Sequence, residues 1–133
     1  MTTVAAWYAA LKGITVAGTT ALAEPPLSAP SARLPALFVD TVAVDEQTIH
    51  KGVLGGQRVL KGRIVILMGS PGQDRQANRW SDTLTMADTL SAALRLMTNP
   101  TGGPLEWTLA CTADFDRSGY WAVTANVQAV EWT

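Results

Sequence analysis

The sequence predicts an α+β domain with a single mixed, largely antiparallel sheet of four to five strands packed by two helices. Two segments carry apolar residues at helical spacing, and other segments carry them in strand-like runs or in alternation. Short turn-forming segments join strands that are consecutive in the chain, which favours antiparallel pairing. At 133 residues the chain suits one domain over residues 1–133, large enough for a core without metals or disulfides.

The first helix is predicted near the N-terminus, where Thr2 or Thr3 can cap it and Gly13 is placed to end it. Its apolar residues lie at i, i+3, i+4 and i+7, and they are Val4, Trp7, Tyr8 and Leu11. Residues 18–36 then combine small residues with several prolines, which predicts an extended proline-rich connector. This connector is too short to separate two domains.

The N-terminal apolar stretch could be mistaken for a secretion signal, because a small-residue triplet lies at 21–23. Lys12 and Gly13 interrupt that stretch, and no positive charge precedes it. No later run approaches the roughly 20 apolar residues of a membrane span. We therefore expect no membrane contacts. The lone Cys111 excludes an internal disulfide, so we expect a cytosolic protein.

The middle of the chain predicts a strand at 34–39, a polar turn around Asp45 and Glu46, and then a hairpin. Gly55 and Gly56 give a two-residue hairpin signal between runs that can pair as antiparallel strands. The second arm of this hairpin is apolar on both sides in its far half. One side carries Leu60, Ile64, Ile66 and Met68, and the other carries Val65 and Leu67.

A second helix and a final hairpin follow. Residues at helical spacing are Trp80, Leu84, Ala87, Leu90, Leu94 and Met97. Thr85 with Asp88 fits a capping box that would begin this helix at Met86, and the NPTGGP segment at 99–104 ends it. Two alternating segments then predict strands joined by DFDRSG at 114–119. Their apolar faces are Trp107, Leu109, Cys111, Ala113 and Phe115 in one, and Trp121, Val123, Ala125, Val127 and Ala129 in the other.

The predicted sheet has more apolar surface than its helices can cover. Two helices cover about one face, yet the central strand is apolar on both, and leaving large side chains wet forfeits roughly 1.5 to 3 kcal/mol each. The second face is therefore covered either by another copy of the chain or by the proline-rich connector. The sequence leaves both possibilities open.

The charge balance argues against a protein that grips nucleic acid or an anionic membrane. Ten Lys plus Arg stand against eleven Asp plus Glu, for a formal charge of −1, and no block of like charge occurs. Arg58, Lys61 and Arg63 form the only mild basic cluster. No aromatic residues are interleaved with them, which favours a solvated strand face over a nucleic-acid track.

Residues 68–80 (MGSPGQDRQANRW) resemble a strand, Gly-rich turn and helix start that could hold a phosphate. A P-loop would need Gly, Lys and Ser or Thr where Asp74, Arg75 and Gln76 stand, and a dinucleotide turn would need Gly at Pro71. Pro71 also removes a backbone donor. We therefore expect no nucleotide cofactor and interpret this polar connection as a partner-binding loop or a solvated one.

DFDRSG matches the first half of a calcium loop, with oxygen donors at alternate positions and Gly at the sixth. The twelfth position is Ala125 rather than a bidentate Glu, and Asp, Ser and Gly are also what a tight turn requires, so a turn is favoured over a calcium site.

Candidates for nucleophilic catalysis are one His and one Cys. Cys111 lies on the apolar side of its predicted strand and His50 among polar hairpin residues, so we expect neither a catalytic dyad nor an enzyme.

The order of the segments resembles the tail terminator proteins of long, non-contractile-tailed bacteriophages. The resemblance covers nearly the whole chain and is carried by WYAALKGITVAG, the proline-rich connector into LPALFV, a long hairpin ending in RIVILMG, the polar QDRQANR loop, TMADTLSAALRLM and a final hairpin. It implies a non-enzymatic virion protein assembled in the host cytoplasm. Such a protein forms a hexameric ring at the head-proximal end of the tail, ends polymerisation of the tail tube protein, and meets the head-tail connector protein while DNA passes through.

On this resemblance, contact surfaces are expected at the central hairpin and the 70–79 loop. The candidate interface residues are Gly55, Gly56, Gln73, Asp74, Arg75, Gln76 and Arg79. A head-completion or neck protein would share almost every feature. A small ligand-binding or hydrolytic domain is the alternative from a different class, and it predicts a monomer with a closed pocket.

Overall fold

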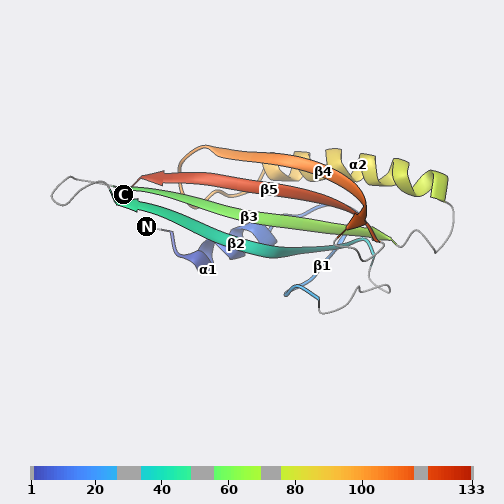
Figure 1. The fold of residues 1–133 in the computed structure, drawn as a ribbon, viewed down its shortest axis with the longest axis horizontal. Helices are drawn as coiled ribbons and strands as arrows, with labels where there is room; N and C mark the ends of the chain where they lie inside the picture. The colour runs from blue at the N-terminus through green and yellow to red at the C-terminus, as the bar shows by residue number, and fades with distance from the viewer. Residues whose placement is uncertain (1, 27–33, 49–55, 70–75, 116–119, 133) are drawn as a thin grey trace.

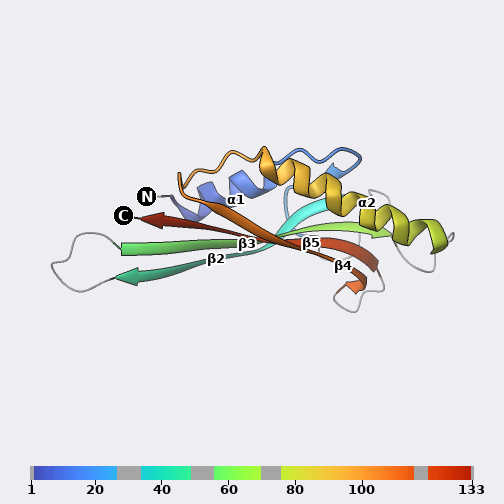
Figure 2. The same cartoon turned by 90° about the horizontal axis from the view of Figure 1, so that it is seen from above.

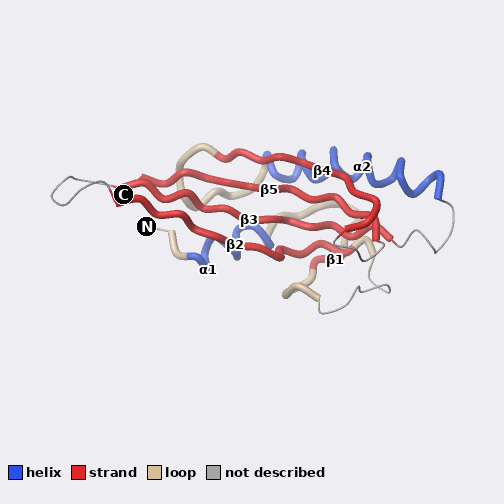
Figure 3. The backbone as a smooth tube through the Cα atoms, in the orientation of Figure 1, coloured by secondary structure: helices blue, strands red, loops and turns tan. Residues whose placement is uncertain are grey.

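The computed structural model describes residues 2–26, 34–48, 56–69, 76–115 and 120–132. Within them, two helices lie on the same face of a five-stranded mixed sheet, so the predicted α+β class is confirmed (Figures 1 and 2). The strands are β1 (Thr20–Ala21), β2 (Ala36–Thr48), β3 (Gly56–Gly69), β4 (Leu105–Phe115) and β5 (Tyr120–Trp132). They lie side by side in the order β1-β2-β3-β5-β4 (Figure 3), and every pairing is antiparallel except that of β1 with β2.

Helix α1 (Val4–Lys12) begins and ends as its sequence predicts. The Thr3 side chain accepts a hydrogen bond from the Ala6 amide at 3.0 Å, and the Gly13 amide donates to the Ala9 carbonyl. The helix packs Trp7 and Leu11, both fully buried, against β2 and β3. The Trp7 indole also donates to the Lys61 carbonyl at 3.1 Å, which satisfies its buried N–H.

Helix α2 (Gln76–Arg95) is longer than predicted, and the capping box at Thr85 is wrong. Residues 76–85 contain neither Gly nor Pro, so nothing in their backbone chemistry stops the helix from extending back to Gln76. The Thr85 hydroxyl instead donates to the Ser81 carbonyl at 3.1 Å, as a helix-interior Thr does. Trp80 packs edge-to-face on Trp121 of β5 with ring centroids 6.0 Å apart, which fastens this early part of the helix to the sheet.

Strand β2 runs through the predicted polar turn, so the turn at Asp45 and Glu46 and the two-residue hairpin at Gly55 and Gly56 are both wrong. Asp45 and Glu46 pair with Val59 and Arg58 in the ladder, and Gly56 opposes Thr48. The residues that join the two strands are therefore 49–55, which lie outside the described residues. Cross-strand ion pairs keep these carboxylates in the strand, since Lys61 Nζ lies 2.8 Å from Asp45 Oδ2 and Arg58 Nε lies 2.8 Å from Glu46 Oε1.

The main core lies between the helices and the sheet. It collects the predicted inner face of β3, the predicted face of β5, and Leu90 and Leu94 of α2. A β-bulge between Val39 and Thr41 keeps Val39, Val42 and Val44 on this side of β2. A second irregularity, between Thr112 and Phe115 of β4, moves Phe115 to the opposite face, so its predicted place beside Trp107 is wrong.

Among the described residues, the buried apolar side chains of the second face lie at one end of the sheet, and the chain itself covers that end. Phe38, Val65, Leu67 and Ala122 are buried there beneath Leu22, Leu34, Phe115 and Tyr120. Part of the connector is held as β1, whose neighbour Leu22 donates its amide to the Leu37 carbonyl at 2.8 Å. Of the two possibilities left open by the sequence, the connector is the one that contributes the cover, and this apolar patch gives no argument for a second copy.

The turn at 99–104 brings β4 beside β5. Asn99 Oδ1 accepts from the amide and hydroxyl of Thr101, at 3.0 and 2.8 Å, and the Asn99 amide group donates to the Gly103 carbonyl at 2.8 Å. Gly102 has φ +73°, and a Cβ on Gly103 would lie 2.0 Å from the Val130 carbonyl oxygen. Two glycines are therefore needed for different reasons, one for its dihedral angles and one for close approach to β5.

Candidate assembly interface

The structure places three of the predicted interface residues and separates them. Gly56 begins β3, while Gln76 and Arg79 lie in the first turn of α2, at the other end of the sheet (Figure 1). The predicted 70–79 loop is therefore wrong for residues 76–79, which are helical. Gly55, Gln73, Asp74 and Arg75 lie outside the described residues. The described part of the predicted interface is thus two separate places rather than one continuous surface.

Both borders of the sheet are long strand edges. Strand β4 is the outermost strand at one border, and among the described residues β2 pairs with β1 only through Ala36 and Leu37. From Phe38 to Thr48 the outer side of β2 is therefore an edge as well. Edges of this length present rows of backbone donors and acceptors that another strand can pair with. Neither edge was predicted, although the alternation in TVAVD at 41–45 is a strand signal that could have shown how far β2 extends.

Each edge carries a stripe of half-buried apolar side chains on the helix side of the sheet. Val42 and Val44 form the stripe on β2, and Leu105, Trp107, Leu109 and Cys111 form the stripe on β4. These side chains pack against the core on one side only. A further strand placed along either edge would complete their burial.

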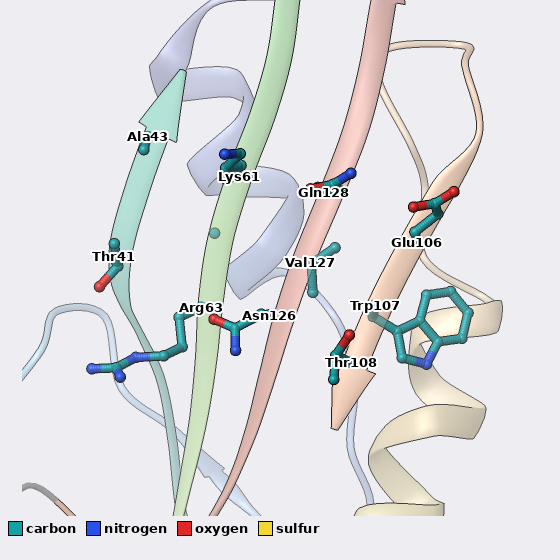
Figure 4. A pocket seen from close by; sticks show the side chains of 11 residues that line it. Thr41, Ala43, Lys61, Arg63, Glu106, Trp107, Thr108, Asn126, Val127 and Gln128 are labelled. Carbon is teal, nitrogen blue, oxygen red and sulfur yellow. The ribbon is translucent and has the colours of Figure 1, made fainter. Parts of the chain in front are cut away.

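The open face of the sheet forms a shallow polar trough of about 750 Å³ across all four long strands (Figure 4). Its exposed floor and walls include Thr41, Ala43, Lys61, Glu106, Thr108 and Asn126. Gly62 adds only backbone to the floor, because its missing side chain makes room for Leu11 of α1 on the other side. The trough is thus a wide surface rather than an enclosed ligand cavity.

The three cations of β3, Arg58, Lys61 and Arg63, are all ion-paired. The predicted solvated strand face is wrong for Arg58. Lys61 pairs with Asp45, and Arg63 pairs with Asp40 and lies 5.3 Å from the centre of the Phe115 ring. Arg58 is buried on the helix side, between Glu46 and Glu131. The pairing of Lys61 and Arg63 with aspartates lowers the attraction of the open face for phosphates.

Cys111 packs against α2 as a half-buried thiol, with its Sγ 3.8 Å from the Thr83 carbonyl oxygen. Burial raises the pKa of this thiol, and the charge of Asp88 adds to the effect. His50 lies outside the described residues, as do the glycine-rich residues 70–75 and residues 116–119 of DFDRSG. Elsewhere in the described chain, no three His, Cys, Asp or Glu residues gather as metal ligands would.

The raised pKa of Cys111 predicts slow alkylation in the folded state. Fewer thiolates form at a given pH than in an unfolded peptide, so iodoacetamide at pH 8 should modify the native chain more than about tenfold more slowly than the denatured chain. Mass spectrometry of quenched samples measures both rates. Equal rates would show that the thiol is neither buried nor shifted.

A scan against protein-family models found no match, and a search of curated proteins found no significant match. Among the described residues, neither helix combines the length and apolar content needed to cross a bilayer.

Proposed function

We propose that this chain is a structural virion protein that forms a ring on the phage tail tube, ends tube polymerisation and joins the tail to the head connector. The observation that carries the proposal is the pattern of strand directions. The four long strands β2, β3, β5 and β4 alternate in direction, so β2 and β4, at the two borders, run opposite to each other. The resemblance in segment order supplies the specific role.

This pattern allows one contact to repeat around a ring. If neighbouring copies are related by rotation about an axis along the strands, β4 of one copy lies antiparallel to β2 of the next. This contact between β4 of one copy and β2 of the next, called the seam below, therefore continues the antiparallel sheet already present within each copy. A contact between two different surfaces that closes after a fixed number of copies makes a ring, and the resemblance implies six.

Half-buried apolar side chains would line such a seam on the helix side of the sheet. On the helix side, Val42 and Val44 of one copy would lie beside the Trp107 and Leu109 stripe of the next, and each stripe is half-buried in the single chain. Two chains joined this way would remove apolar surface from water at every seam. Association is thus favoured without any further apolar patch on the second face.

The layers also suggest which face lines the ring. Both helices lie on one face (Figure 2), and the layer with helices needs the larger circumference, so the open polar face turns inward. Lys61 and Arg63 on that face are paired with Asp45 and Asp40. A lining of this kind would let DNA pass without holding it, because phosphate contacts need available cations.

Two alternatives make different predictions. A head-completion or neck protein would form the same kind of ring and differ in the partner that it binds. A small ligand-binding or hydrolytic domain would stay monomeric and use a closed pocket, whereas the trough described above is spread across four strands.

Capping of the tail tube tests the proposed role. Adding the chain to polymerising tail-tube subunits of the same phage should shorten the tubes and leave a ring at one end in negative-stain images. The variant with both Arg75→Glu and Arg79→Glu should form rings that no longer attach, since the segment before α2 and its first turn are the expected contact with the tube. Unchanged tube lengths with the unmodified chain would contradict the role, and full attachment of the variant would remove these arginines from the interface.

A further inference from the structure

A row of charged side chains crosses the sheet on its helix side, near the chain termini. Arg58 of β3 directly opposes Glu46 of β2 and Glu131 of β5 in the ladders. Its Nε donates to Glu46 Oε1 at 2.8 Å, and its Nη1 donates to Glu131 Oε1 at 3.0 Å. Arg58 and Glu131 are only 8% and 7% exposed. Three strands are thus joined side chain to side chain at one level of the sheet.

Thr2 contacts two members of this row, Arg58 and Glu131. Its amide donates to both carboxylate oxygens of Glu131, at 3.0 and 3.1 Å, and its carbonyl accepts from Arg58 Nη1 at 2.5 Å. Its hydroxyl lies 2.5 Å from Glu131 Oε2 and 3.3 Å from the Pro100 carbonyl oxygen, and its one proton serves one of these acceptors at a time. Thr2, which precedes the Thr3 cap of helix α1, is itself 7% exposed and is thus as buried as a core residue.

The row lies at the end of the sheet where the buried apolar residues of β3 stop. The β2–β3 ribbon extends beyond α1 at this end (Figure 2), and Leu60 is the last fully buried apolar residue of β3 in that direction. Beyond Leu60, charged groups and Thr2 replace apolar contacts. A buried ion pair adds little stability over an apolar pair, whereas removing one partner leaves a costly buried charge. Such a row is better suited to fixing one arrangement than to adding stability.

We propose that Thr2 acts as a strap that locks the projecting end of β2, β3 and β5, and that its release frees this end while the apolar core stays folded. The strap has two attachment points, the carboxylate of Glu131 for its donors and the guanidinium of Arg58 for its carbonyl. The two attachment points lie on the paired strands β3 and β5. Any movement of Thr2 away from the sheet therefore breaks contacts with both strands at once.

The protonation of Glu131 is consistent with a strap that is closed near neutral pH. The hydrogen bond from the Thr2 hydroxyl, followed by those from the Thr2 amide and Arg58, holds the pKa of Glu131 below its usual value against the effect of burial. The charged groups around it are Arg58, the N-terminal amino group, which also lowers the pKa of Glu131, and, beyond Arg58, Glu46. Because the folded pKa is the lower one, this contribution is present above the ordinary carboxylate range and is lost as the pH falls through the lowered pKa.

Hydrogen exchange of the Glu131→Gln variant tests the strap. Gln keeps the shape of the side chain but removes its charge and one acceptor. Amides at 57–60 and 129–132 should exchange about tenfold faster or more, while those at 64–67 in the middle of β3 keep their rates. Thr2→Val, which removes only the hydroxyl, is the milder second variant and should give a smaller acceleration at the same amides.

Lys61→Met is the matched control. It removes another ion pair between β3 and β2, that of Lys61 with Asp45, but on the open face and between side chains that are at least half exposed. Its exchange at 57–60 should match the unmodified chain. The proposal is overturned if both strap variants exchange at the unmodified rate at 57–60, or if their acceleration is equal at 64–67, which would reflect a uniform loss of stability.

Discussion

A chain carrying both Ala43→Glu and Ala110→Glu is expected to be monomeric under conditions in which we expect the unmodified chain to form rings. Ala43 lies on the open-face side of the β2 edge and Ala110 on the exposed side of the β4 edge. In the proposed seam Ala43 lies level with Glu106 of the next copy, whereas Ala110 lies four residues further along its edge, level with Phe38. Two further carboxylates would add like-charge repulsion of several kcal/mol, on the order of 3 or more, to each seam. Native mass spectrometry measures the loss of the ring.

The charge-swapped variant is the control for this prediction. Ala43→Lys combined with Ala110→Glu adds the same number of bulky side chains to the same edges but places opposite charges across the seam. It should retain rings, while the double-Glu chain should not. Matching thermal unfolding of the two variants under dissociating conditions would show that neither fold is damaged. Rings formed equally by both variants would place the contact between copies elsewhere.

Gly103→Ala is expected to cost about 3 kcal/mol of unfolding free energy or more, at the upper end for overpacking. A Cβ at this position would lie 2.0 Å from the Val130 carbonyl oxygen and 3.2 Å from its carbonyl carbon. These are backbone atoms of β5, so no side-chain rotation relieves the clash, and the start of β4 must shift. Urea unfolding followed by tryptophan fluorescence measures the loss.

Gly102→Ala is the adjacent control for this prediction. Gly102 has φ +73°, but nothing lies within 4 Å of the position that its Cβ would take. The cost is then only that of a left-handed residue, about 1–2 kcal/mol. A loss at Gly103 no greater than that at Gly102 would show that the turn moves easily, and that β4 is not held to β5 by close backbone approach.

Most of the fold could be predicted because its strongest signals are periodic. The alternation from Trp121 to Ala129 and the two-sided apolar run of β3 predicted faces that the structure has. The predicted polar turn in β2 was wrong because Asp45 and Glu46 look like turn residues until their partners Lys61 and Arg58 are known. Those partners are separated from them along the chain, and only the pairing register brings them together.

The candidate site was harder to predict for a related reason. The sequence drew attention to polar loops, whereas the assembly that we propose uses the edges of β2 and β4, and an edge depends on the order of strands in the sheet. The strap at Thr2 was missed because both Thr2 and Thr3 can cap a helix. Only the placement of Glu131 beside Arg58 shows that Thr3 caps α1 while Thr2 binds the sheet.

The mass of the unmodified chain in solution, measured by native mass spectrometry over a range of micromolar concentrations, tests most directly whether its two sheet edges join copy to copy. We expect one closed hexameric species whose edge amides in β2 and β4 are protected from hydrogen exchange. A monomer at every concentration, or a two-fold dimer with both edges still exchanging freely, would contradict the proposed ring.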